Sequence, residues 1–207
     1  MDNQKQPSIS IVMTVHDQAE ALEQNLPAFL TVPYEGTFEV IVVDDMSADE
    51  TPDVLKRMKA EYPNLYTTFL PESVIFNPSR KQLALSVGAK AAHYDYIVLT
   101  DIHHAPVNTE WLAGLADGEA SLVYTNRKKN RVTHVFATDL KDLRPTILKA
   151  ERHSLRNYSG TWFRKRRGLY DAVCVKREHI FDTIRLYDHR IRGFRLLGLR
   201  LRVLMGL

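Results

Sequence analysis

The sequence predicts an α/β sandwich with a mostly parallel central sheet. Three observations support this prediction. Apolar runs of strand length alternate with segments of helical periodicity, the strand-like runs are almost continuously apolar, and acidic residues follow two of them. A continuously apolar strand is typical of a parallel sheet that is covered on both faces. We therefore expect a three-layer arrangement, with ligands bound where the carboxyl ends of the strands meet.

The predicted elements alternate from residue 8 to residue 126. Apolar runs predict the strands, and apolar residues at helical spacing predict the helices between them. The third helix is expected to bury Leu83, Val87 and Ala91, and the second is expected to use Thr51 as its N-cap. The strands are expected at 8–15, 38–43, 65–70, 95–101 and 120–126, and the helices at 18–30, 51–62, 77–94 and 108–118.

The alternation weakens after residue 127. Residues 169–177 predict one more strand and residues 178–187 a helix, while the charged residues 138–157 are compatible with a helix. We accordingly divide the chain by function. The expected parts are a ligand-binding half at 1–125, a shorter half at 126–189, and a basic, apolar tail at 190–207 that could lie at a membrane interface.

The net charge of +3 conceals two parts of opposite sign. Residues 1–125 carry 7 basic and 18 acidic side chains, a net of −11, whereas residues 126–207 carry 21 and 7, a net of +14. Such a division indicates that the second part faces an anionic partner. Nucleic acid, an anionic membrane surface and the acidic first part itself are the candidates.

Composition limits the class of protein and its compartment. The 207 residues suit one large domain or one domain with an appendage. A single cysteine, Cys174, excludes an internal disulfide and a cysteine-rich zinc site, and it is expected to be a small buried apolar residue. No apolar run reaches about 18 residues, and the N-terminus is polar. We expect a cytoplasmic protein, which could lie peripherally on the inner face of the plasma membrane.

Acidic side chains stand at the ends of two predicted strands. Asp44 and Asp45 follow the strand at 38–43, and Asp101 ends the strand at 95–101. Core packing requires no like-charged pair there, and the carboxyl ends of parallel strands share one edge of a sheet. We therefore expect the three carboxylates at a common rim, although Asp44 and Asp45 also suit a simple cap of the following turn.

Four segments resemble a known family. ISIVMTVHDQAEALEQNL, VIVVDDMSADET, SRKQLALSVGAKAA and YIVLTDIHHAPVNTEWL are similar to the nucleotide-binding half of a family 2 glycosyltransferase of the bacterial envelope-polysaccharide type. The resemblance covers about residues 8–125 and implies the GT-A fold, a Rossmann-like three-layer sandwich. The nucleotide-binding positions that it implies are Thr14, Val15 and His16 at the base, Asp44 at the base edge, Asp45 near the ribose, Lys81 at the phosphates, and Asp101 at a metal.

The sequence departs from this family at the metal motif. The family's Asp-x-Asp pattern implies Asp101 and the residue two positions later as metal ligands, and that residue is His103, followed by His104. The implied cofactor is a divalent metal, Mn²⁺ or Mg²⁺, but an imidazole suits Mn²⁺ or Zn²⁺ and suits Mg²⁺ poorly. A surface histidine pair without a ligand is the alternative, and Lys81 could likewise be a plain solvated charge.

A second departure concerns the catalytic base. An inverting transferase needs a group that takes the proton of the acceptor hydroxyl, and in this family a carboxylate of a Glu-Asp pair usually does so. No such pair occurs after Asn126, and Asp171 and Asp188 remain as candidates. The half of the chain that would bind the acceptor therefore looks shortened.

We expect a glycosyltransferase that moves a sugar from a nucleotide-diphosphate sugar to a glycan or lipid-linked acceptor, with inversion at the anomeric carbon. The first alternative is a catalytically silent relative that binds a nucleotide or a partner transferase, alone or as an oligomer. The second is a nucleic-acid-binding protein that uses the basic second part, although no nucleic-acid-binding module is recognisable.

Overall fold

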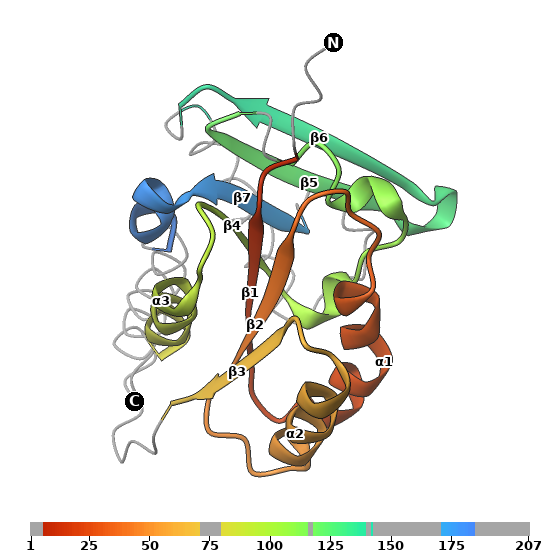
Figure 1. The fold of residues 1–207 in the computed structure, drawn as a ribbon, viewed down its shortest axis with the longest axis vertical. Coiled ribbons are helices and arrows are strands. Elements are labelled where there is room, and N and C mark those ends of the chain that lie inside the picture. Colours follow the sequence, from red (N-terminus) through yellow and green to blue (C-terminus); the bar gives the residue numbers. More distant parts are fainter. Residues whose placement is uncertain (1–5, 71–79, 116–117, 140–141, 143–170, 185–207) are drawn as a thin grey trace, which may run out of the picture.

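The protein is described here by a computed structural model that defines residues 6–70, 80–115, 118–139, 142 and 171–184. It is an α/β sandwich in which a seven-stranded sheet separates two helical layers (Figure 1). The predicted fold class is confirmed. Asp188, the tail at 190–207 and nearly all of the helix predicted at 138–157 lie outside the described residues.

The sheet has the strand order β3-β2-β1-β4-β7-β5-β6. β1, β2, β3 and β4 are parallel, β7 is antiparallel to both β4 and β5, and β6 is antiparallel to β5. The carboxyl ends of the four parallel strands therefore share one edge with the amino end of β7. The strands are β1 Ile9–Val15, β2 Phe38–Asp44, β3 Leu65–Phe69, β4 Tyr96–Thr100, β5 Ala120–Asn126, β6 Arg131–Ala137 and β7 Ala172–Lys176.

Helices cover both faces of the sheet. α1 (Ala19–Leu30) and α2 (Thr51–Glu61) lie on one face, and α3 (Arg80–Ala91) lies on the other (Figure 1). The described part also contains helical residues 180–184, which lie within the helix predicted at 178–187, and four short 3₁₀ turns: η1 Ile102–His104, η2 Thr109–Trp111, η3 Arg127–Lys129 and η4 Arg177–His179. Among the described residues, no helix combines the length and apolarity that crossing a bilayer requires.

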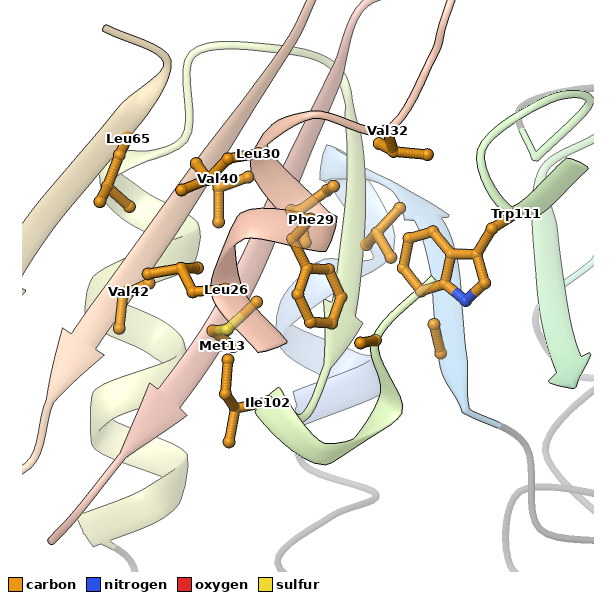
Figure 2. Close-up of a cluster of buried hydrophobic side chains, with 14 of the residues drawn as sticks. Met13, Leu26, Phe29, Leu30, Val32, Val40, Val42, Leu65, Ile102 and Trp111 are labelled. Carbon is orange, nitrogen blue, oxygen red and sulfur yellow. The ribbon is translucent and has the colours of Figure 1, made fainter. Parts of the chain in front are cut away.

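The larger core cluster lies between α1, α2 and the sheet. Phe29 from α1 and Trp111 from η2 are fully buried at its centre and meet edge to face, with ring centroids 5.7 Å apart (Figure 2). Met13 and Ile102 pack into the same cluster. Trp111 thus ties the chain after β4 to the first helix, and this contact positions the loop that carries Asp101.

The smaller cluster, under α3, corrects one prediction. Leu83 is 53% exposed and Ala91 is exposed, whereas Ala84, Leu85 and Ala89 are buried. The reason is a close approach at Gly88, where an added Cβ would stand 2.5 Å from Val12 Cγ1 and 3.0 Å from Val43 Cγ2. The helix therefore faces the sheet with Ala84, Leu85, Gly88 and Ala89, while Val87 is half-buried against the same cluster.

Several element boundaries also differ from the predictions. The helix expected at 108–118 is only the turn η2, and Thr51 is the first helical residue of α2 rather than its N-cap. β6 was not predicted, because Arg131, Thr133 and His134 interrupt its apolar residues. It forms as the outer strand of a hairpin with β5, which supplies all its sheet hydrogen bonds among the described strands.

Cys174 lies in the middle of β7 and is 1% exposed, so the expected buried cysteine is confirmed. Burial raises the pKa of its thiol to about 12. The thiolate is the reactive form, and a free thiol ionises at about pH 8.5. We therefore expect the native protein at pH 8 to react with iodoacetamide at least about a hundredfold more slowly than the urea-unfolded chain. Equal rates, measured by mass spectrometry, would contradict this burial.

Candidate functional site

The loops that follow β1 and β2 are joined by hydrogen bonds around Asp17. The Asp17 carboxylate Oδ1 accepts from the N–H of Ala48 at 2.7 Å and of Asp49 at 3.3 Å, and the Asp17 N–H donates to Ser47 Oγ at 2.9 Å. Asp17 and Met46 both adopt left-handed backbone conformations, with φ of 51° and 61°. Non-glycine residues rarely adopt such φ values, and these often mark functional loops.

Further bonds complete this junction. Asp49 Oδ2 accepts from the N–H of Ala19 at 3.1 Å, and Thr51 Oγ1 accepts from the N–H of Gln18 at 3.0 Å. Hydrogen bonding from Thr51 first, and then from backbone N–H groups, lowers the pKa of Asp49. Asp49 and Thr51 are therefore structural residues, and much of the VDDMSADET segment serves to hold two loops in place.

Asp44 holds the turn that follows β2. Its Oδ1 accepts from both the N–H and the Oγ of Ser47, at 3.0 and 2.6 Å, and the residue is 7% exposed. The cap that was considered as the simpler alternative is thus present. Asp44 also borders a cavity of about 560 Å³ between α2 and β3, together with Met46, Pro52, Leu55, Lys56, Lys59 and residues 67–70.

Asp45 and His16 stand side by side at the rim. The Asp45 N–H donates to the carbonyl of Val15 at 2.8 Å, which continues the pairing of β1 with β2. The His16 Nδ1 donates to the carbonyl of Asp45 at 2.7 Å, while its Nε2 lies 3.6 Å from Asp17 Oδ2. The His16 side chain is 57% exposed, so its ring remains available to a ligand.

The other positions expected at the base contribute differently. Val15 is 2% exposed, so its side chain belongs to the core and only its backbone borders the rim. Thr14 is half-buried in β1 and is paired with Val43 of β2. Lys81 is exposed near the start of α3.

Asp101 begins the turn after β4 and is held in place by that turn. Its Oδ1 accepts from the N–H of His103 at 3.1 Å. Arg127, in η3, donates to the carbonyls of His103 and Ala105 and thereby stabilises the same turn. Asp101 and His103 therefore stand together at the carboxyl edge, as expected.

The turn that carries Asp101 and His103 meets the loop that follows β1. Gln18 Nε2 donates to His103 Nε2 at 3.1 Å, so the imidazole presents a lone pair at this nitrogen. Because β1 separates β2 from β4, this contact brings the loops of all three strands together at one edge. A carboxylate oxygen and an imidazole lone pair form a donor set that Mn²⁺ accepts. Asp101 and His103 are thus residue types that Mn²⁺ accepts, while the lone pair of His103 Nε2 is here engaged by Gln18.

Comparison with known proteins identifies the family. The sequence profile of glycosyl transferase family 21 matches residues 1–122, which contain β1 to β4 and the loops that follow β1, β2 and β4. The chain belongs to glycosyl transferase family 21. The resemblance to glycosyltransferases is therefore confirmed, while the narrower assignment to family 2 stays a prediction.

Two curated relatives match parts of this family 21 chain. Uncharacterized protein Rv1520 of Mycobacterium tuberculosis is 31% identical over 93 residues, which are 45% of this chain and 26% of the relative. Probable glycosyltransferase YdaM of Bacillus subtilis is 27% identical over 111 residues, which are 51% of this chain and 25% of the relative. The chain thus spans about a quarter of the length of the curated relatives it matches.

A solved structure supports the fold. It is the mannosyltransferase PcManGT from Pyrobaculum calidifontis in complex with GDP-Man and Mn²⁺. The alignment covers 84% of this chain and 46% of the mannosyltransferase chain, with a TM-score of 0.54 and 22% identity. The family 21 chain therefore has the GT-A fold that was expected.

Asp171 also reaches the rim, although it lies far from Asp101 in the sequence. It directly precedes β7, whose Ala172 is paired with Thr100 of β4, and Thr100 Oγ1 donates to the Asp171 carbonyl at 3.0 Å. Asp171 Oδ1 lies 3.9 Å from His104 Nε2. Of the two candidate bases, Asp171 thus stands beside the metal motif, and Asp188 lies outside the described residues.

A second group of potential metal ligands lies elsewhere. Glu119, Glu178 and His179 come within mutual reach at the opposite edge of the sheet, near the amino end of β4. The ammonium of Lys176 already pairs with Glu119 and its pKa is raised by that hydrogen bond. This arrangement explains the group as a surface charge network, apart from the rim.

Sequence reasoning missed three residues that shape the rim. Asp17 joins two loops, Gln18 contacts His103, and Arg127 fixes the turn of the metal motif. No local pattern distinguishes them, since each is one polar residue among others in a loop. Only the left-handed conformation of Asp17 hints at its role, and that conformation is a property of the structure.

Proposed function

We propose that this chain forms the donor-binding part of a glycosyltransferase that uses a nucleotide-diphosphate sugar. The contact between Gln18 and His103 is the observation that carries the proposal, because it brings the loop after β1 against the metal motif after β4. Membership of glycosyl transferase family 21 supports the class of reaction. The mannosyltransferase with the similar fold was captured with GDP-Man and Mn²⁺, and this supports the class of donor.

Each rim residue would contact a different part of the nucleotide-sugar donor. The exposed ring of His16 offers a stacking face for the base, and the Asp45 carboxylate, half-buried beside it, suits the ribose hydroxyls. Lys81 could reach the phosphates from the start of α3. Asp44 serves chiefly to fix the loop through Ser47, so we assign it an indirect role.

Asp101 and His103 would hold a divalent metal, which when bound neutralises the charge that develops on the departing nucleotide diphosphate. Given the imidazole, we propose Mn²⁺ rather than Mg²⁺. Two loops and the bond from Arg127 keep this pair in position before the donor arrives. Such preorganisation lowers the cost of arranging ligands during the reaction.

The acceptor and the stereochemistry follow from the family resemblance. We propose transfer with inversion to a glycan or lipid-linked acceptor, at an anionic membrane surface that the basic residues of the second part would contact. The silent-relative and nucleic-acid alternatives have less support, because the chain belongs to a glycosyltransferase family and the loops after β1 and β4 meet at the rim.

Calorimetric titration tests the proposal. UDP, GDP, UDP-glucose and GDP-mannose are titrated into the folded protein, with and without Mn²⁺. We expect one nucleotide and its sugar derivative to bind with micromolar affinity, and Mn²⁺ to strengthen the binding at least about tenfold. Absence of binding by all four compounds, in the presence of Mn²⁺, would overturn the proposal.

A further inference from the structure

A groove runs between helix α2 and the outermost strand, β3. β3 stands at one edge of the sheet and α2 lies beside it (Figure 1). The cavity of about 560 Å³ described above forms this groove, and residues 67–70 make one of its walls. The opposite wall consists of residues three or four apart on one face of α2, namely Pro52, Leu55, Lys56 and Lys59. The groove is therefore bounded by a strand edge on one side and by a helix on the other.

The outer edge of β3 carries backbone groups that no other described strand pairs with. On the inner edge, the Asn64 carbonyl accepts from the N–H of Val40, and the Leu70 N–H donates to the carbonyl of Asp44, each at 2.9 Å. The N–H and C=O of one strand residue point to the same side, and the side alternates along the strand, so the even-numbered residues face β2. Thr67 and Phe69 therefore direct their N–H and C=O groups outward.

The side chains of β3 do not protect this edge. Exposed edge strands usually carry charged residues or proline, which prevent pairing with other chains. β3 contains neither, and Phe69 at its end is 74% exposed. Met46, across the groove, is 38% exposed. An open strand edge beside exposed apolar side chains is the kind of surface to which an extended peptide adds a further strand.

The exposed charge of the groove is positive. Lys56 and Lys59 are exposed, and no carboxylate of the described residues forms an ion pair with either ammonium. The Asp44 carboxylate also borders the cavity, but it is 7% exposed and accepts hydrogen bonds from Ser47. Residues 1–125 carry a net charge of −11, and two of their seven basic side chains line this one groove. The groove thus complements an acidic ligand.

We propose that this groove binds an extended, acidic segment of a partner protein. The segment adds a strand to β3, inserts an apolar side chain into the cavity and sets carboxylates against Lys56 and Lys59. A second copy of this chain is the less suitable occupant, because two-fold pairing along β3 would bring its own Lys56 and Lys59 to the same groove. The inference goes beyond the proposed function, since the nucleotide sugar takes no part in it.

A designed peptide tests the proposal on the full chain. The probe has the sequence TETFTET and carries an uncharged fluorophore. Alternate residues of a strand face the same side, so its two glutamates and its phenylalanine would face α2 together, and the sequence reads alike in both directions. We expect fluorescence anisotropy to give a dissociation constant of about 10–100 µM. The control peptide TKTFTKT should bind at least about tenfold more weakly.

Reversing the charge of the groove should reverse this preference. We expect the double variant Lys56→Glu and Lys59→Glu to bind TETFTET at least about tenfold more weakly than the wild type, and TKTFTKT more tightly. Both side chains are exposed, so the variant should fold. Lys90→Glu is the matched control, because Lys90 is exposed on α3 at the other face of the sheet, and it should leave both affinities within about twofold.

Amide hydrogen exchange tests the strand pairing itself. Bound TETFTET should slow exchange at the N–H groups of Thr67 and Phe69, and should leave Thr68 unchanged, because the Thr68 N–H faces β2. Absence of binding to the wild type, an unchanged preference in the double variant, or no protection at Thr67 and Phe69 would reject the proposal. Displacement of the peptide by UDP or GDP would assign the groove to the donor instead. A dimer that Phe69→Ala dissociates in sedimentation would assign it to a second copy.

Discussion

Replacing Asp101 by alanine is expected to lower sugar transfer at least about a hundredfold and to weaken Mn²⁺ binding to a similar degree. The cause would be the loss of the carboxylate from the proposed metal site, which would then keep only the imidazole of His103. Mn²⁺ binding is measured by the loss of the free-ion electron paramagnetic resonance signal, which requires no activity, and transfer by release of nucleotide diphosphate.

The matched variant separates charge from folding. Asp101 also accepts a hydrogen bond from the N–H of His103, so the alanine variant loses a cap of the turn as well as a ligand. Asp101→Asn keeps an oxygen for this cap and removes the charge. We expect Asp101→Asn to fold as the wild type and still to lose most Mn²⁺ affinity. If it binds Mn²⁺ as tightly as the wild type, Asp101 is not a metal ligand.

Replacing Phe29 by alanine is expected to lower the free energy of unfolding by about 3–5 kcal/mol. Phe29 is fully buried, and its ring packs against Trp111, so truncation leaves a cavity between α1 and the turn η2. Domains of this kind have a total stability of about 5–15 kcal/mol, so the loss is a large part of it. Urea unfolding followed by circular dichroism measures the change.

Phe69 provides the same substitution in a different environment. Its side chain is 74% exposed at the end of β3, and we expect Phe69→Ala to change the free energy of unfolding by less than about 0.5 kcal/mol. If the two variants lose equal free energy of unfolding, the burial of Phe29 in the core of Figure 2 does not stabilise the fold as described. The comparison removes the effect of the substitution itself on the unfolded chain.

The strands of the parallel half were predictable because burial on both faces demands continuous apolar runs. β1, β2 and β4 meet this demand, and each appears within two residues of its expected bounds. β6 was missed because it is an edge strand with exposed Val135 and Phe136, and its pairing with β5 is a tertiary effect. The buried face of α3 was missed for a similar reason, since Gly88 brings the helix unusually close to β1.

The candidate site was predictable in position and less so in detail. Acidic residues after parallel strands must share an edge, so Asp45 and Asp101 could be placed at a common rim. The sequence allowed Asp44 either to cap the following turn or to contact a ligand, and only the structure shows that its carboxylate accepts from Ser47. The approach of Asp171 to His104 depends on β7 entering the sheet next to β4, and that choice of neighbour is set by the whole fold.

The position of β7 has a consequence for the order of folding during synthesis. Among the described strands, the hairpin of β5 and β6 joins the parallel half by strand pairing only through β7, which is the last of the seven to leave the ribosome. Until Ala172–Lys176 has emerged, the nascent chain exposes an unpaired side of β4 and of β5, and such sides invite pairing with other chains. The unpaired sides of β4 and β5 would therefore be most open to pairing with other chains while the ribosome is still translating the region between β6 and β7.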